Sequence, residues 1–462
     1  MPYQETILKE LYHSFESHNL SDGLQVNLKG WVRTNRNNGS IGFIELSDGT
    51  TFLNVQLVYS KDQVDDFDSY SHYLTGSSLS VNGEVKLTPN MKQPFEIHVH
   101  HIELLGGVSD DYPLQKKRHT FEFLRDIAYL RPRTNTFYAL ARVRSKLSYA
   151  MHKWFNDNDF YYIHTPIITG IDSEGAGQVF DVNAKKEDGK PFFDKPVHLT
   201  VSGQLHVEPF ALALRNVYTF GPTFRAENSN TPRHASEFWM VEPEMAFCDI
   251  HKALKIVENL LKYCINDLLK NAKDELNFFN AFVDKNLLER LHKIVDSSWE
   301  VIPYTKAVEI LEDAKNKGHH FDNENIFWGM DLQSEHERYI TEQVVKGPTW
   351  IIDYPKEAKA FYMKQNPDGK TVAAYDLLVP EIGELIGGSQ REDDYEKLRQ
   401  RMEECHLLKD DSALWYLNTR RFGGCVHSGF GIGFDRFLML LTGLNNIRDV
   451  QLYPRTANQV KY

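Results

Sequence analysis

The sequence predicts an α+β protein with an N-terminal β-barrel and a larger domain in which helices alternate with strands. Several short segments with alternating apolar residues lie between residues 26 and 105, which is typical of a small antiparallel barrel. Residues 134–158 and 249–295 instead carry apolar residues at helical spacing. Between them, residues 221–247 have the pattern of a strand, a long polar loop and a second strand, which indicates a hairpin.

Composition limits the function classes. The 462-residue chain is long enough for two or three domains with a large core. Its net charge of −12 means that any RNA contact must come from local basic patches. The four cysteines form no CxxC pair, which fits a reducing compartment and argues against a cysteine zinc site. No apolar run reaches the roughly 18 residues of a membrane span, and the N-terminus lacks a secretory signal, so we expect a cytoplasmic protein.

The N-terminal segments predict a closed five-stranded barrel, for which the OB-fold is the natural candidate. A short amphipathic helix is expected before them, and the dipeptides Asp48-Gly49 and Asn82-Gly83 are expected in turns. We place this domain at residues 1–107 and a hinge or linker at 108–133. The expected strands are residues 26–35, 40–48, 51–59, 78–87 and 95–105.

The remaining residues, 134–462, predict the larger domain. Its expected helices are residues 134–158, 249–295 and 391–405, and residues 198–214 are expected to run strand, turn, helix. Its expected strands include residues 160–169, 349–355 and 359–364, and residues 373–388 are expected to form a further strand and turn. At the end, GFGIGFDRFLMLLTG (429–443) is a glycine-rich strand that runs into an apolar helix.

The loop of the 221–247 hairpin carries three potential cations, Arg225, Arg233 and His234. Long loops in compact domains are usually functional, and arginine presents a planar fork of donors that suits phosphate oxygens. Phe238, just beyond the loop, offers a flat face for a base. These residues predict a polyphosphate site, with a solvated hairpin whose charges pair with neighbouring glutamates as the alternative.

Familiar catalytic and nucleotide-binding motifs are otherwise absent from the sequence. The segment 170–180 is glycine-rich but lacks the GxxxxGK[ST] phosphate loop. His336-Glu337 begins an HExxH pattern, but Ile340 stands where the second histidine should be. The GxGxG of the C-terminal segment has no opening strand–helix unit, so a dinucleotide fold is not indicated.

The stretch FRAENSNTPRHASEF, followed by Glu242 and Glu244, resembles motif 2 of the class II aminoacyl-tRNA synthetases, most closely in the asparaginyl and aspartyl branch. The helix and strand that end at Pro166 resemble motif 1, and residues 429–443 resemble motif 3. With a barrel in front, the order matches the aspartyl, asparaginyl and lysyl subgroup. The resemblance implies a catalytic domain over 134–462 with a mixed, mainly antiparallel sheet flanked by helices, and a homodimer formed through motif 1 around Pro166.

This family implies a two-step reaction. The amino-acid carboxylate attacks the α-phosphate of ATP and pyrophosphate leaves; the acyl-adenylate then passes to a terminal ribose hydroxyl of tRNA. By similarity, Arg225 and Arg436 are the expected catalytic residues: Arg225 holds the α-phosphate, and Arg436 and Phe238 cover the two faces of adenine. The other positions expected on the ATP side are Glu227, Arg233 and His234.

The resemblance also assigns metal and amino-group contacts. Asp376 and Glu384 are expected to hold Mg²⁺ between the phosphates, a role that suits oxygen ligands, although their spacing is one residue longer than in the aspartyl enzymes. Glu174 and Gln204 match positions that bind the α-amino group of the substrate.

In the barrel, Phe43 and Gln56 fall where the subgroup reads the central anticodon base, by stacking and by hydrogen bonds, with Arg33 and Glu96 assisting. The alternative for Phe43 is a residue of the barrel core.

The expected amino acid is L-asparagine, and the expected RNA is tRNA(Asn). Arg391 lies where the aspartyl enzymes bind the substrate side chain. Val207 replaces a lysine of those enzymes, and Glu242 can accept a hydrogen bond from an amide NH₂ but would repel a carboxylate. Aspartate is the alternative substrate. Two rival classes, a tRNA-independent asparagine-forming enzyme and an RNA-binding protein with a degenerate synthetase body, are disfavoured by the barrel and by the presence of Arg225, Glu384 and Arg436.

Overall fold

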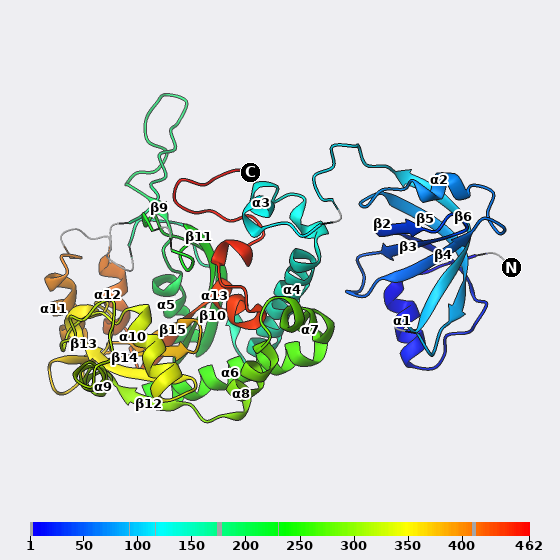
Figure 1. The fold of residues 1–462 in the computed structure, drawn as a ribbon. Coiled ribbons are helices and arrows are strands. Elements are labelled where there is room, and N and C mark those ends of the chain that lie inside the picture. The colour runs from blue at the N-terminus through cyan, green and yellow to red at the C-terminus, as the bar shows by residue number, and fades with distance from the viewer. Residues whose placement is uncertain (1–2, 92, 116, 173–177, 230, 409–412) are drawn as a thin grey trace. The chain divides into compact units, whose positions relative to one another are not determined.

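The computed structural model describes residues 3–91, 93–115, 117–172, 178–229, 231–408 and 413–462. The chain forms two compact units, Met1–Ala141 and Arg142–Tyr462 (Figure 1). The boundaries that the sequence suggests, at residues 107 and 133, stay a prediction.

The N-terminal unit contains a closed β-barrel. In the sheet β1-β2-β3-β4-β6-β5, a further pairing of β2 with β5 closes the ring, and β4 runs parallel to β6. The predicted OB-fold barrel is therefore confirmed. Its elements are β1 (Gln4–Glu5), α1 (Leu8–Glu16), β2 (Gln25–Asn37), β3 (Ile41–Ser47), β4 (Val55–Ser60), α2 (Phe67–Ser71), β5 (Ser78–Leu87) and β6 (Phe95–Gly106).

Strict alternation along the strands separates the barrel core from its outer face. Ile44, Leu57 and Ile97 are fully buried, and they pack in one cluster with Leu8 and Leu11 of α1. Because successive side chains of a strand point to opposite faces, the residues between the buried positions lie on the outside. Helix α1 thus caps the apolar interior, and the polar positions of β3, β4 and β6 remain accessible.

Asn82-Gly83 does not form the predicted turn; both residues lie within β5. The strand continues through them because β5 pairs with β6 along its whole length, with a register shift between Asn82 and Gly83. A Cβ atom on Gly83 would lie 2.5 Å from the carbonyl oxygen of His98. The glycine therefore permits close backbone approach at a bulge rather than a chain reversal.

The C-terminal unit is built on one eight-stranded sheet of order β12-β13-β14-β15-β16-β11-β10-β7. Within this sheet β7–β10 and β12–β13 pair in parallel and the other neighbours pair antiparallel, so the sheet is mixed and mainly antiparallel, as expected. A two-stranded sheet pairs β8 with β9. The strands are β7 (Tyr161–Tyr162), β8 (Ile168–Thr169), β9 (His198–Leu199), β10 (Asn216–Phe224), β11 (Glu237–Ala246), β12 (Glu300–Pro303), β13 (Thr349–Pro355), β14 (Thr371–Val379), β15 (Gly383–Gln390) and β16 (His427–Gly433).

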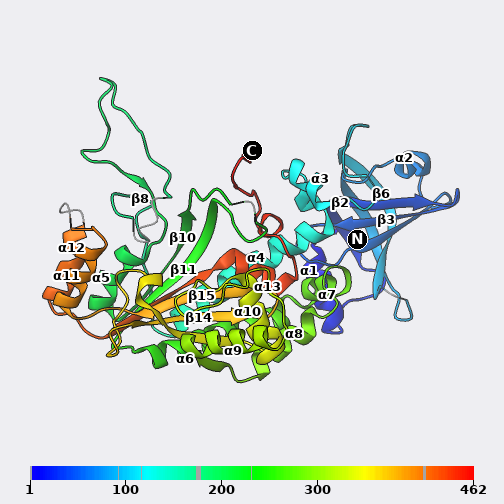
Figure 2. The ribbon, with the colours of Figure 1, turned by 60° about the vertical axis from the view of Figure 1, so that its left-hand side comes forward.

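Helices α6, α8 and α9 lie along one side of this sheet (Figure 2). Amphipathic α6 buries Leu254, Leu261 and Leu268 on one face, which explains its helical spacing in the sequence. No helix in the described part of the chain is long and apolar enough to cross a membrane. The helices are α3 (Phe121–Asp126), α4 (Asn135–Asp157), α5 (Gln204–Leu214), α6 (Ile250–Asn271), α7 (Lys273–Phe282), α8 (Leu287–Asp296), α9 (Tyr304–Asn316), α10 (Ser334–Arg338), α11 (Tyr395–Glu404), α12 (Leu414–Arg421) and α13 (Phe434–Thr442), with a π-helix at Tyr339–Val344.

The strand predicted at residues 359–364 is wrong: this segment is irregular, with a single bridge from Met363 to Arg391. Phe361 and Tyr362 are both buried in a cluster with Leu398 and Tyr416. Two consecutive side chains that face the same core are incompatible with the alternation of a strand. The apolar run therefore reflects burial of a loop.

Candidate functional site

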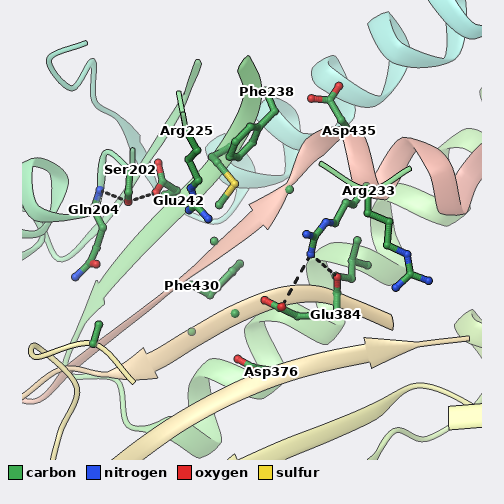
Figure 3. A pocket seen from close by; sticks show the side chains of 18 of the residues that line it. Ser202, Gln204, Arg225, Arg233, Phe238, Glu242, Asp376, Glu384, Phe430 and Asp435 are labelled. Carbon is green, nitrogen blue, oxygen red and sulfur yellow. Dashed lines mark hydrogen bonds and ion pairs between the residues drawn. The ribbon is translucent and has the colours of Figure 1, made fainter. Parts of the chain in front are cut away.

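The C-terminal unit holds a cavity of about 340 Å³ over strands β11, β14, β15 and β16. Ser202 and Gln204 lie at one end of it, and Arg233 and Glu384 at the other (Figure 3). Glu174 lies outside the described residues. The other residues predicted to contact ATP, Mg²⁺ or the amino acid all line this cavity: Gln204, Arg225, Glu227, Arg233, His234, Phe238, Glu242, Asp376, Glu384, Arg391 and Arg436.

The hairpin of β10 and β11 positions the first arginine. The strands pair antiparallel from Asn216 with Met245 to Phe224 with Glu237, so Arg225 begins the loop. The backbone N–H of Arg225 donates to the Ser236 carbonyl at 3.0 Å, which closes the loop at its base. The Arg225 guanidinium lies 5.4 Å from the ring centre of Phe238. A cation and an aromatic face are thus held together at the wall of the cavity.

Arg233 connects the loop to two other segments. Its Nη1 donates to Ser334 Oγ of α10 at 2.9 Å, and its Nη2 donates to the Glu381 carbonyl in the turn between β14 and β15 at 3.3 Å. Burial lowers the pKa of Arg233, and the Glu337 carboxylate acts in the opposite direction. We call these two hydrogen bonds the Arg233 latch. Sequence reasoning did not anticipate this contact with α10.

His234 is less cationic than the sequence suggests. Burial, and then the positive charge of Arg436, lower the pKa of its imidazole below the ordinary value. Glu227 lies 3.8 Å away and only partly compensates. A neutral imidazole carries no charge and donates or accepts one hydrogen bond at each nitrogen. In the free protein the loop therefore offers two permanent cations, the arginines, rather than three.

Two carboxylates converge above the floor of the cavity. A Cβ atom built on Gly387 would lie 3.2 Å from Glu384 Oε1 and 3.4 Å from Asp376 Oδ1, so both oxygens face the space left by this glycine. The other Asp376 oxygen accepts from Lys359 Nζ at 2.6 Å. Burial raises the pKa of Asp376, and the charge of Glu384 adds to that rise, while Lys359 opposes it.

Glu337 of α10 adds a third carboxylate behind this pair. It accepts a hydrogen bond from the backbone N–H of Glu384 at 3.1 Å and fixes the start of β15. Burial, together with the charges of Glu384 and Asp376, raises its pKa to about 7. Among the described residues, no group of three His, Cys, Asp or Glu side chains is arranged to hold a metal ion by itself. Mg²⁺ usually takes one or two carboxylates plus substrate phosphates and water, so the two converging oxygens fit it in that mode.

The C-terminal strand–helix unit contributes Arg436 and a structural carboxylate. Arg436 Nη1 donates to the Glu384 carbonyl at 3.1 Å and lies 3.9 Å from Glu384 Oε2. Asp435, 1% exposed, accepts from Arg144 of α4 at 2.5 Å and from the backbone N–H of Trp239 at 3.2 Å. Asp435 therefore ties α13 to α4 and β11, a role that sequence reasoning did not assign.

Glu242 lines the cavity near Ser202 and is held in one orientation. Its Oε1 accepts from Ser202 Oγ, and its Oε2 accepts from the backbone N–H of Gly203 at 2.9 Å. The side chain is 5% exposed. A buried carboxylate held by two donors keeps acceptor capacity on its remaining lone pairs.

Arg391 is paired with a second glutamate. Its Nε donates to Glu244 Oε2 at 3.2 Å, its Nη2 donates to Glu244 Oε1, and its Nη1 donates to Ser389 Oγ at 2.8 Å. Burial disfavours the charge, but Glu244 outweighs it and raises the pKa of Arg391. A Cβ atom on Gly429, in the adjacent strand, would lie 2.0 Å from Glu244 Oε1. The glycine thus provides the space that this ion pair fills.

Val207 does not line the cavity. It is fully buried in a cluster with Ala211 and Val217, on the packed side of α5. The valine at position 207 therefore gives no direct information about the pocket for the substrate side chain. This part of the specificity prediction has no structural support. The residue of α5 that does line the cavity is Gln204.

The outer face of the barrel brings three of the four predicted anticodon residues to neighbouring strands. Phe43 is half-buried on β3 and lies outside the core cluster. On the adjacent strands, Gln56 Nε2 donates to Glu96 Oε2 at 3.1 Å. The Arg33 guanidinium instead donates to the Arg133 carbonyl at 2.5 Å and to Asn135 Oδ1. We name Phe43, Gln56 and Glu96 the barrel face.

The cation beside the barrel face is Arg36, which sequence reasoning missed. Its guanidinium lies 5.3 Å from the ring centre of Phe43. The two residues are direct neighbours in the pairing of β2 with β3. A register prediction for the first hairpin of the barrel would have identified it.

Comparison with known families matches both units. Residues 120–457 match the model of tRNA synthetases class II (D, K and N), and residues 26–105 match that of the OB-fold nucleic acid binding domain. The chain is 52% identical over 471 aligned positions to the asparagine--tRNA ligase of Clostridium acetobutylicum, covering 99% of this chain and all of that protein. It is 53% identical to the enzyme of the same name from Clostridium novyi, covering 98% of each.

Solved structures of asparaginyl-tRNA synthetases are similar to this chain over nearly its whole length. Asparaginyl-tRNA synthetase from Pyrococcus horikoshii, complexed with asparaginyl-adenylate, superposes with a TM-score of 0.86 at 33% identity, covering 99% of both chains. The Entamoeba histolytica asparaginyl-tRNA synthetase, also in complex with asparaginyl-adenylate, gives 0.82 at 25% identity over 96% of this chain and 97% of that one.

Proposed function

The chain belongs to the class II tRNA synthetases of the D, K and N group, and we propose that it activates L-asparagine with ATP and transfers it to tRNA(Asn). The observation that carries this proposal is the cavity itself. Arginines, an aromatic face and paired carboxylates line one end of it, while a buried glutamate and a buried arginine line the other. The first set suits a nucleotide polyphosphate, and the second suits a carboxamide.

Adenylate formation needs positioning and charge neutralisation more than a protein nucleophile. We assign Arg225 to the α-phosphate and the attacking carboxylate, because its guanidinium lies between the two ends of the cavity (Figure 3). Phe238 and Arg436 cover the adenine, and Glu227 lies on the ATP side with them. Removal of pyrophosphate leaves the mixed anhydride, which the terminal ribose hydroxyl of tRNA then attacks.

The β- and γ-phosphates fall to Arg233 and His234. For this role Arg233 has to exchange the bonds of the Arg233 latch for phosphate oxygens. Asp376 and Glu384 would hold Mg²⁺, whose charge would neutralise phosphate oxygens when it is bound. The convergence of their oxygens over Gly387 supports this assignment. Lys359, bonded to Asp376, supplies a further positive charge at this end.

Asparagine recognition rests on two fixed groups. The Arg391 guanidinium donates to the side-chain oxygen of the substrate, and Glu242 accepts from its NH₂. Because Arg391 is already paired with Glu244, and Glu242 adds a further carboxylate to the cavity, an aspartate side chain would meet excess negative charge. Glu174 and Gln204 are assigned to the α-amino group.

The barrel face is assigned to the central anticodon base, with Phe43 stacking and Gln56 and Glu96 forming hydrogen bonds. We add Arg36, which lies against Phe43, and keep Arg33 as an assisting residue. A half-buried aromatic with neighbouring polar groups on the outer face of an OB-fold supports single-stranded RNA binding.

We also propose a cytoplasmic homodimer. The free cysteines of the described chain suit a reducing compartment. Around Pro166, the apolar residues Tyr161, Ile167 and Ile168 are 57%, 45% and 43% exposed, which is the kind of patch that a subunit interface covers.

ATP–pyrophosphate exchange with asparagine and with aspartate tests the function. We expect exchange that depends on asparagine, and charging of tRNA(Asn). Aspartate used as efficiently as asparagine would refute the proposed specificity, and Glu242→Gln should erode the preference between the two. Sedimentation of the purified chain measures the dimer.

A further inference from the structure

Helix α5 places a buried carboxylate directly behind Gln204. Glu208 follows Gln204 by one helical turn, so the two side chains lie on the same face. Glu208 is 0% exposed and does not line the cavity. Its Oε2 accepts a hydrogen bond from Gln204 Nε2 at 3.0 Å. The carboxylate therefore contacts a residue of the cavity wall without facing the cavity itself.

Four groups from three elements hold Glu208. Oε2 also accepts from Tyr416 OH at 2.7 Å. Oε1 accepts from His427 Nε2 at 2.8 Å and forms an ion pair with Arg420 Nη2 at 2.5 Å. Arg420 is anchored in turn through its Nε, which donates to the Glu392 carbonyl at 2.8 Å. Both oxygens are thus saturated by groups whose own positions are fixed.

This network keeps Glu208 ionised. Burial alone would favour the neutral acid, but the charges of Arg420 and His427 outweigh it and lower the pKa of Glu208. His427 Nδ1 faces the Cys425 carbonyl at 2.6 Å while its Nε2 faces Glu208. Both partners are acceptors, so the ring satisfies them only when both nitrogens carry protons.

An ionised carboxylate accepts hydrogen bonds and donates none. Only the NH₂ group of the Gln204 amide can therefore face Glu208, and the carboxamide oxygen must face the cavity (Figure 3). We propose that Glu208 is a positioning residue that fixes the Gln204 amide with its oxygen toward the substrate, and so selects a ligand with a hydrogen-bond donor at that point. This inference rests on the proposed function, in which that donor is the α-ammonium group of asparagine.

A purely structural role would leave a different signature. If Glu208 served only to balance Arg420 and His427, its replacement would affect folding and all ligands alike. If it orients Gln204, its replacement frees the amide to rotate, and only ligands that carry the α-amino group lose affinity. Succinamic acid, which is asparagine without its α-amino group, distinguishes the two roles.

The test compares the unmodified protein with Glu208→Gln in asparagine-dependent pyrophosphate exchange, with succinamic acid as a competing ligand. A hydrogen bond to a charged group corresponds to about ten- to a hundredfold in affinity. We expect the KM for asparagine to rise by about that factor, while the inhibition constant of succinamic acid and the KM for ATP stay near their original values. Tyr416→Phe is the matched control, since it removes one donor from the same carboxylate oxygen and leaves Gln204 bonded to Glu208.

A swapped variant, Gln204→Glu with Glu208→Gln, supplies the rescue. It again presents only acceptors at position 204, and the amide introduced at position 208 can donate to them, so asparagine affinity should recover relative to Glu208→Gln alone. If Glu208→Gln does not fold, Glu208→Gln with Arg420→Gln removes both members of the ion pair and is measured in the same way.

Equal losses for asparagine and succinamic acid, or no recovery in the swapped variant, would overturn the inference. A change confined to kcat would overturn it as well. Absence of asparagine-dependent exchange in the unmodified protein would overturn the proposed function, and this inference with it.

Discussion

The barrel face and the cavity of the C-terminal unit hold their candidate residues in opposite ways. On the barrel, Phe43 is half-buried and lies against Arg36, and the Gln56 amide donates one hydrogen bond to Glu96. In the cavity, Arg391 is 3% exposed and bonds to Glu244 and Ser389. The barrel residues lie over a complete apolar core, whereas the cavity residues form part of the packing.

This difference predicts how each region responds to mutation. A residue on the barrel face can be truncated without loss of the core, so its effect should be confined to RNA binding. A buried charged residue in the cavity holds its partner as well as the substrate, so its loss should affect both folding and catalysis.

The largest effect is expected from Arg391→Met. It leaves Glu244 as an unpaired buried charge, which typically destabilises a protein by about 3 to 5 kcal/mol. Denaturant unfolding measures this loss, and asparagine activation should vanish with it. In the double variant Arg391→Met with Glu244→Leu, stability should return because both charges are removed, while activity stays absent. If the double variant is still unstable, the loss of stability does not come from the unpaired Glu244 charge alone, and this explanation of the Arg391→Met effect is wrong.

Arg225→Ala should nearly abolish adenylate formation with little effect on stability. Its guanidinium is assigned to phosphate charge in a partly dry site, where loss of one such contact costs about 3 to 4 kcal/mol of transition-state stabilisation. Pyrophosphate exchange should fall by about two to three orders of magnitude, as it should for Arg436→Ala. Arg421→Ala, an exposed residue on α12, is the control. Near-normal exchange in Arg225→Ala would reject its assignment.

Phe43→Ala should weaken tRNA charging alone. Stacking on an aromatic contributes about 1 to 3 kcal/mol per base, so the KM for tRNA should rise while tRNA-independent exchange and the unfolding midpoint stay unchanged. Trp31→Ala removes another exposed aromatic of the barrel, 48% exposed, and should leave charging intact. An equal fall in exchange and charging would mean that the barrel face is not an independent site.

The smallest effect concerns thiol reactivity, which reports burial without changing function. Burial raises the pKa of Cys248 to about 12 and also raises that of Cys264. Since the thiolate is the reactive form, both should stay protonated and resist iodoacetamide from about pH 7 to about pH 9, while exposed Cys405 is alkylated. Mass spectrometry of the modified peptides measures this. Labelling of Cys248 before Cys405 would contradict the packing around β11.

Local patterns predicted the elements that carry the site. Apolar and aromatic runs on both sides of a polar loop identified the strands that flank residues 225–236, and β10 and β11 pair as that pattern indicates. Helical spacing likewise identified α4 and α6. These predictions succeed because burial on one face imposes its period on neighbouring residues.

The features that the sequence did not predict depend instead on contacts between segments that are distant in the chain. Asn82-Gly83 has a turn signal, yet pairing with β6 keeps it in a strand. The two bonds of the Arg233 latch join residues 101 and 148 positions apart, and His427 contacts Glu208 across 219 positions. Contacts of this kind depend on how the sheet brings distant segments together, and no local period records them. The buried glutamate at position 208 was the available signal, because an ionisable residue on the packed side of an apolar helix needs partners.

Gly429 restricts the mutational paths open to this cavity. Its strand pairs with Glu244 on one side and with Ser389 on the other, so the backbone cannot yield to a new side chain that would meet Glu244 at 2.0 Å. A lineage that gains a side chain at position 429 must first shorten Glu244, and that step alone removes the partner of Arg391. A side chain at position 429 therefore cannot be gained without disturbing the Arg391–Glu244 ion pair, so these three positions constrain one another.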